Sequence, residues 1–114
     1  MVTSSDMILF RGNDATFQLT VKKIDGSAYS LALCTLTLYV KRKETEKNSD
    51  AVLTKTTGDG ISVGDITGIV IITILDTDTT NLEVDINFVY DIELETPAGL
   101  KFTILRGAFR LRQN

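Results

Sequence analysis

The C-terminal stretch Phe88–Leu111 constrains the fold more than any other part of the chain, because it reads as two strands joined by a tight turn. Side chains in its first half alternate between apolar and mostly acidic, and a period of two residues is typical of a half-buried strand. This stretch therefore predicts a sheet with one face on a core. The apolar face holds Phe88, Tyr90, Ile92 and Leu94, and the other face holds Val89, Asp91, Glu93 and Glu95.

The turn Thr96–Gly99 decides how these two strands pair. A two-residue loop, Pro97-Ala98, would place an apolar side chain of the second strand on the polar face. A three-residue loop ending in a left-handed Gly99 keeps the apolar residues together and pairs a charge, so we expect this register. The predicted pairs are Phe102 with Leu94, Ile104 with Ile92, and Lys101 with Glu95.

Past Ile104 the alternation slips by one residue. Leu105 would then point outward, although Phe109 and Leu111 share its parity. A β-bulge adds one residue to a strand and reverses the alternation of every later residue in that strand. The sequence predicts such a bulge at Arg106-Gly107.

Length and composition indicate one globular domain, residues 1–114, with residues 1–6 as a flexible arm. The 114 residues carry a formal net charge of −3 and no histidine, so the chain lacks the basic surface of a nucleic-acid binder. No apolar run is long enough to span a bilayer, and the N-terminus does not read as a signal peptide. The single cysteine, Cys34, excludes an internal disulfide and fits synthesis in a reducing cytosol.

Short β-branched runs separated by turn residues recur along the chain, as in an all-β, immunoglobulin-like antiparallel sandwich of two sheets. We expect about seven to nine strands and at most one helical turn, near Asp76–Glu83, capped by Thr77 or Asp78. Ile69–Leu75 is apolar on both faces and is predicted to be a central strand covered on both sides. Lys41–Asp50 is charged throughout and is expected to be an exposed, mobile loop. The other predicted strands are 7–10, 15–23, 34–41, 51–57 and 61–63.

The predicted core follows from the inward parity of these strands. Cys34 shares the inward face of its strand, and we interpret it as a small buried hydrophobe. The core is expected to contain Phe17, Leu19, Val21, Leu36, Leu38, Val40, Val70, Ile72, Ile74, Phe88, Tyr90, Ile92, Leu94, Phe102 and Ile104.

No group of residues in the sequence forms a recognisable catalytic or metal-binding motif. The absence of histidine excludes Ser-His-Asp and Cys-His arrangements and histidine-based zinc sites. Gly58-Asp59-Gly60 reads as a turn, because a strand-like segment rather than a helix follows it. Asp76-x-Asp78, near Asp59 and Asp65, could hold calcium, but turn formation and capping are favoured. The carboxylates of the final hairpin read as a solvated face. We therefore expect no enzyme activity, cofactor or metal.

Several landmarks in order resemble a family of small immunoglobulin-like domains from the baseplate and tail proteins of tailed bacteriophages and prophages. The chain departs from that family at Leu31-Ala32-Leu33 and lacks its proline in the one-turn crossover. The resembling residues are Arg11-Gly12-x-Asp14, Asp25-Gly26 with Leu31, Val40-Lys41, Gly68, Asp76-x-Asp78-Thr79 with Leu82, Tyr90-x-Ile92-x-Leu94, Gly99 and Leu105-Arg106-Gly107.

The resemblance implies a virion structural protein of the tail or baseplate, made in the host bacterial cytoplasm, that binds other phage structural proteins. A capsid decoration protein and a carbohydrate- or receptor-binding module are the alternatives, and a homo-oligomer is plausible. Arginines near the C-terminus either protect an edge strand or dock an acidic partner. A second candidate contact is the loop Lys41–Asp50. The predicted interface consists of Ile8, Phe10, Leu105, Arg106, Phe109, Arg110 and Arg112.

Overall fold

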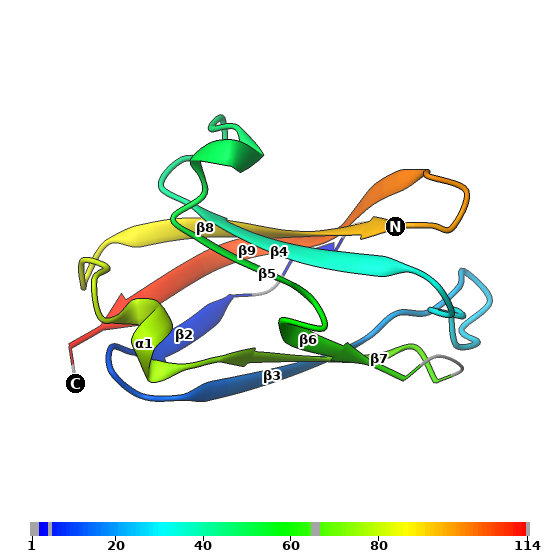
Figure 1. Ribbon diagram of the computed structural model, residues 1–114, viewed down its shortest axis with the longest axis horizontal. Helices are drawn as coiled ribbons and strands as arrows, with labels where there is room; N and C mark the ends of the chain where they lie inside the picture. The colour runs from blue at the N-terminus through cyan, green and yellow to red at the C-terminus, as the bar shows by residue number, and fades with distance from the viewer. Residues whose placement is uncertain (1–2, 5, 65–66, 114) are drawn as a thin grey trace.

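A computed structural model describes residues 3–4, 6–64 and 67–113 as a β-sandwich with two single helical turns (Figure 1). The predicted all-β, immunoglobulin-like class is confirmed. The strands are β1 (Thr3–Ser4), β2 (Met7–Phe10), β3 (Ala15–Thr20), β4 (Thr35–Lys41), β5 (Leu53–Thr57), β6 (Gly60–Val63), β7 (Ile69–Ile74), β8 (Asn87–Glu95) and β9 (Lys101–Arg112). The helical turns are η1 (Asn48–Asp50) and α1 (Asp76–Thr79).

Hydrogen-bonded neighbours follow the order β1-β9-β8-β4-β5-β6-β7-β3, with β2 also paired to β9. The path turns at the short β5–β6 contact, so that β9-β8-β4-β5 forms one layer and β6-β7-β3 the other (Figure 1). The sheets were predicted to be antiparallel, but β1 and β2 run parallel to β9, and β5 runs parallel to β6 at their short contact. Within the expected arm, Thr3–Ser4 form β1, whereas residues 1–2 and 5 lie outside the described residues.

The core lies between the two layers and contains most of the residues predicted for it. Phe17, Leu19, Val21 and Ile104 are only partly buried, because β3 is the last strand of its layer and Ile104 lies off the ladder. Phe102 was predicted to be buried and is 47% exposed near the tip of the hairpin. Residues buried beyond those predicted are Met7, Leu9, Leu31, Ile61, Leu82, Leu105, Phe109 and Leu111.

The final hairpin has the predicted loop but a different bulge. Gly99 has a φ of +88°, and Phe102 pairs with Leu94 as expected. The register then shifts, so that Leu105 rather than Ile104 lies opposite Ile92. The bulge is therefore at Ile104, upstream of the predicted Arg106-Gly107.

The early bulge turns Leu105 inward, and Phe109, which was predicted to lie at an interface, is also part of the core. Leu105 and Phe109 do not point outward; they are 8% and 0% exposed. Phe109 meets Phe88 edge-to-face, with ring centroids 6.4 Å apart. Leu105 and Phe109 therefore belong to the core and do not form part of the outer face of β9.

Strand β7 is central within its layer, between β6 and β3, but one of its faces is open. Val70, Ile72 and Ile74 are fully buried, whereas Ile71 and Leu75 are 37% and 47% exposed. The prediction that both faces are covered is wrong, because a two-layer sandwich has no third layer to cover the outer face.

At most one helical turn was predicted, and α1 forms where it was expected, whereas η1 in the charged loop was not predicted. Neither Thr77 nor Asp78 is the N-terminal cap of α1, which is Leu75. Asp78 instead accepts a hydrogen bond from the Leu75 N–H at 2.8 Å, and Asp14 accepts one from the Asp76 N–H at 2.8 Å. Asp78 also pairs with Lys55 of β5 at 2.8 Å, with both side chains largely buried. The turn is thereby attached to both layers.

Truncating Phe109 should destabilise the protein far more than truncating Phe102. Phe109→Ala leaves a cavity beside Phe88, and such changes cost about 3–5 kcal/mol. Phe102→Ala removes a half-exposed ring and should cost less than about 1.5 kcal/mol. Urea unfolding of both variants measures the difference. Equal losses would contradict the burial of Phe109 in the core.

Breaking the Lys55–Asp78 pair should also be costly. Lys55→Met keeps the aliphatic stem but leaves the Asp78 carboxylate without its cation, which we expect to cost about 3 kcal/mol. Arg106→Gln is the control, because the Arg106–Glu44 pair is exposed and worth less than about 1 kcal/mol. Chemical denaturation measures both. A Lys55→Met variant as stable as Arg106→Gln would show that the pair does not attach the turn.

Candidate interaction surfaces

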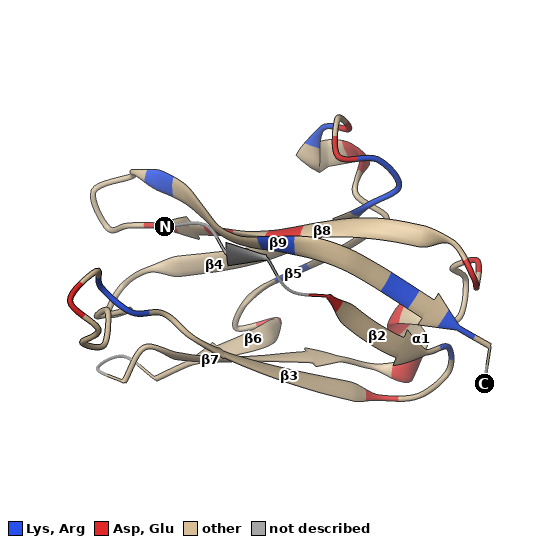
Figure 2. Ribbon diagram, turned by 180° about the vertical axis from the view of Figure 1, so that it is seen from behind, with Lys and Arg blue, Asp and Glu red and all other residues tan. Residues whose placement is uncertain are grey.

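The parallel pairing of β2 with β9 brings four of the predicted interface residues together on the outer face of one layer. Ile8 lies opposite Arg110, and Phe10 lies opposite Arg112. Ile8 and Phe10 are 51% and 47% exposed, because Met7 and Leu9 take the inward positions of β2. We call these four residues, Ile8, Phe10, Arg110 and Arg112, the β2–β9 patch. Figure 2 shows the basic positions along β9 beside β2.

Within the β2–β9 patch, Arg110 is held more firmly than its neighbours. It pairs with Asp6 at 3.8 Å, and Asp6 also accepts a hydrogen bond from the Ala108 N–H at 3.2 Å. The Nε atom of Arg110 is buried without a hydrogen-bond partner among the described residues. The Nε end of the Arg110 side chain is therefore covered, although the side chain as a whole is 42% exposed, and its aliphatic part adds apolar area to the surface.

The remaining predicted interface residue, Arg106, lies apart from the patch. It faces Asp91 across the ladder and donates a hydrogen bond to Glu44 at 3.1 Å. Glu44 belongs to the charged loop expected at 41–50. Most of that loop is exposed as predicted, but Lys41 is not part of it: it ends β4, is 6% exposed and pairs with Asp91 at 3.6 Å.

Arg42 joins the charged loop to the start of β8. Its guanidinium donates two hydrogen bonds to the Glu83 carboxylate and lies over the Phe88 ring, 5.6 Å from the centroid. The guanidinium lowers the pKa of Glu83 below its ordinary value, mainly through the side-chain hydrogen bonds. This pair fixes the first residue of the loop, whereas the later residues extend into solvent.

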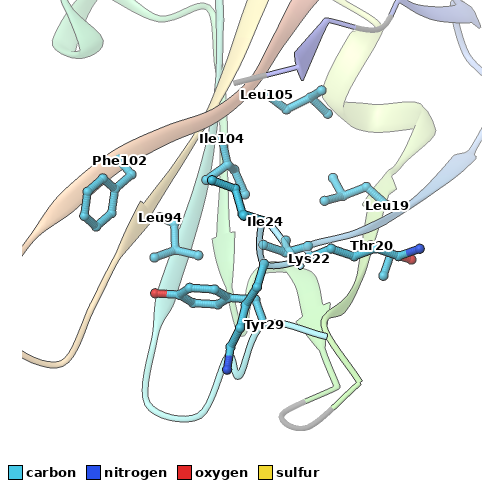
Figure 3. A pocket seen from close by; sticks show the side chains of 11 residues that line it. Leu19, Thr20, Lys22, Ile24, Tyr29, Leu94, Phe102, Ile104 and Leu105 are labelled. Atoms are coloured by element: carbon cyan, nitrogen blue, oxygen red, sulfur yellow. The ribbon is translucent and has the colours of Figure 1, made fainter. Parts of the chain in front are cut away.

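A groove of about 820 Å³ opens at one end of the sandwich, between the end of β3 and the start of β9 (Figure 3). Its walls are mostly apolar, and Lys22 and Lys23 are among the residues that line it. Some of the lining residues were predicted to lie in the core, and the groove itself was not predicted, because no local sequence pattern shows where two sheet edges meet. The lining includes Leu19, Val21, Ile24, Tyr29, Leu94, Phe102, Ile104 and Leu105.

The residues considered for chemistry have structural roles. Burial raises the pKa of the Cys34 thiol, so the reactive thiolate is disfavoured. Gly58–Gly60 joins two strands, without the helix that a phosphate loop needs. Among the described residues there is no group of three or more His, Cys, Asp or Glu that could hold a metal, and Asp65 lies outside them. The Asp78 carboxylate forms an ion pair with Lys55, and the Asp76 carboxylate accepts a hydrogen bond from the Thr77 N–H.

Membrane insertion through a helix has no support in the described part of the chain, where no helix has the necessary length and apolar character.

No protein-family model matches the chain, and no curated protein matches it by sequence. Solved structures match it by shape. A VGSC beta subunit, studied for its multimeric cell-adhesive interactions, is 15% identical with a TM-score of 0.52, covering 97% of this chain and 93% of its own. The extracellular domain of the voltage-gated sodium channel beta4 subunit is 12% identical (TM-score 0.49; 97% and 92% covered). The titin M3 domain is 14% identical (TM-score 0.45; 96% and 90% covered).

At this low identity the likeness to the VGSC beta subunit shows the fold alone, an immunoglobulin-like β-sandwich. The strand order of the structure is of the same type. Strands β9, β8 and β4 lie side by side in one layer, and β6, β7 and β3 form the other. Folds of this kind host many unrelated functions, so the function must be argued from the surfaces.

The Arg42–Glu83 pair makes a prediction about pH. In an NMR titration Glu83 should protonate at a pH below that of an ordinary glutamate, and Arg42→Gln should raise its midpoint. Because the folded pKa is the lower one, the stabilisation is present above the unfolded pKa and is lost as pH falls through the folded pKa. Arg106→Gln, the control, should leave the Glu83 midpoint unchanged. An unchanged midpoint in Arg42→Gln would contradict the pairing.

Proposed function

We propose that this chain is a non-enzymatic, structural interaction domain of a tailed-bacteriophage virion, placed in the tail or baseplate. The observation that carries the proposal is the β2–β9 patch, which presents Ile8 and Phe10 beside Arg110 and Arg112. Aromatic residues and arginine are enriched where proteins meet, and exposed apolar side chains gathered on one face mark a contact surface. The sequence resemblance to phage immunoglobulin-like domains supports the place in the virion.

The patch suits a partner that is apolar at its centre and acidic at its rim. Phe10 and Ile8 would enter a hydrophobic surface, and Arg112, whose side chain is exposed, would meet a carboxylate. Arg110 is already turned towards Asp6 and would contribute contact area more than charge. The patch contains no carboxylate or nucleophile of its own, so it binds and does not react.

The direct test is to locate the chain on particles. An antibody against the purified chain, applied to phage induced from a bacterium that encodes it, should label the tail end in negative-stain electron microscopy. Labelling over the capsid would favour the decoration-protein alternative instead. Particles that carry no label would contradict a virion role altogether.

A matched pair of variants tests the β2–β9 patch. In a phage encoding the chain, Phe10→Ser with Arg112→Glu should reduce incorporation into particles at least tenfold, measured by immunoblot of purified virions. Leu100→Ser is the control, because Leu100 is 59% exposed and lies in the hairpin loop away from the patch. Circular dichroism confirms that both variants fold. Full incorporation of the double variant would show that the patch is not the contact.

A further inference from the structure

The free edge of β3 has the properties of a self-complementary strand. β3 ends the path of hydrogen-bonded strands, and no described strand pairs with the edge opposite β7. Figures 1 and 2 show β3 along the border of the molecule. Edge strands are usually protected by a charged residue, a proline or a bulge, since bare backbone groups attract other strands. Ala15–Thr20 contains none of these.

Backbone geometry shows which residues face the free edge. The Val21 N–H bonds to the Gly68 carbonyl at 2.8 Å, and Leu19 and Phe17 follow in the same ladder opposite Val70 and Ile72. In an antiparallel pair the ladder bonds recur at every second residue. The odd-numbered residues therefore bond to β7, and the backbone N–H and C=O groups of Thr16, Gln18 and Thr20 point away from it.

The charged residues that flank β3 favour one register for the pairing of two copies along this edge. Asp14 and Lys22 lie four residues before and four residues after Gln18, and both are exposed. An antiparallel pair with its two-fold axis at Gln18 sets each Asp14 opposite Lys22 of the second copy. It also sets Thr16 opposite Thr20 of the second copy. In this register the edge-facing backbone groups of the two copies can hydrogen-bond to one another. The carboxylate of each Asp14 faces an ammonium group, and the hydroxyl of each Thr16 faces that of Thr20.

The same register completes the burial of the inner face of β3. Ala15, Phe17, Leu19 and Val21 are only partly buried, because no strand lies beside them. Pairing at Gln18 places Phe17 of the second copy beside Leu19, and Ala15 beside Val21. Leu19 and Val21 line the apolar groove, so the added strand would cover its β3 side (Figure 3).

We propose that two copies of this chain associate through β3, in antiparallel register about Gln18, to join their β6-β7-β3 layers into one continuous sheet. The partner is a second copy because the edge is complementary to itself in charge, backbone direction and apolar face. Asp14 uses one carboxylate oxygen for the Asp76 N–H, which leaves its other oxygen for Lys22 of the second copy. This association is separate from the β2–β9 patch and does not depend on the proposed place in a virion.

Charge exchange provides the first test. Asp14→Lys and Lys22→Asp should each weaken dimerisation at least tenfold in sedimentation equilibrium, because each homodimer would then hold two like-charged pairs. A one-to-one mixture of the two variants should dimerise as the unaltered chain does, since every pair is again opposite in sign. Lys23→Asp is the matched control. It changes the net charge by the same amount as Lys22→Asp, but position 23 alternates to the opposite face of the strand from Lys22. This variant should therefore leave dimerisation unchanged.

Cysteine cross-linking tests the register itself. Two Gln18 residues on the axis would have their Cα atoms about 5.5 Å apart, within reach of a disulfide. Gln18→Cys should form a covalent dimer under mild oxidation. Thr20→Cys should not, because its two copies would be offset by four residues, about 13 Å along the strands. Cys34 is buried and should not interfere.

Three results would overturn the proposal. The first is a chain that stays monomeric at every concentration. The second is a dimer that neither charge variant weakens. The third is a dimer in which Thr20→Cys cross-links as readily as Gln18→Cys. Lys22→Asp is the decisive charge variant, because Lys22 is exposed and lies beyond the end of β3, whereas Asp14→Lys also removes the hydrogen bond from the Asp76 N–H. Unaltered circular dichroism of both variants would exclude unfolding as the cause of lost association.

Discussion

One residue that has no partner across the ladder, Ile104, decides which side chains of the last strand enter the core. Because β9 gains one residue there, the later inward positions are Leu105, Phe109 and Leu111, and the arginines alternate outward. β2 then aligns with this strand in a register that buries Met7 and Leu9. The composition of the outer face, and with it the β2–β9 patch, is a consequence of that single bulge.

The two layers also depend on a charged contact near the corner where they join. Lys55 comes from β5, and Asp78 comes from the helical turn between β7 and β8. Removing both charges from water has a cost, which is offset by the short contact and by the hydrogen bond that Asp78 accepts from Leu75. Asp14, before β3, accepts a hydrogen bond from the same turn, so a four-residue helix is joined to two segments that are distant in the sequence.

The molecule therefore has two candidate contact surfaces of different physical character. The β2–β9 patch is a surface of side chains, apolar and cationic, and suits a partner of a different kind. The β3 edge is a surface of backbone groups and suits an identical strand. Because they lie in different layers, a dimer formed through β3 would leave two patches open, related by a two-fold axis. Such symmetry is the usual basis of protein assemblies.

The sequence by itself determined the fold class, most of the strands, the hairpin loop at Gly99 and much of the core, because alternation and turn chemistry act between near neighbours. The structure alone decided the rest. The bulge at Ile104 depends on which residues the opposite layer can bury, and its position turned Leu105 inward. Exposure of Phe102 and Ile71 depends on where a layer ends. The free edge of β3 exists only because the chain's other segments pair elsewhere, a fact that belongs to topology and not to any local run of residues.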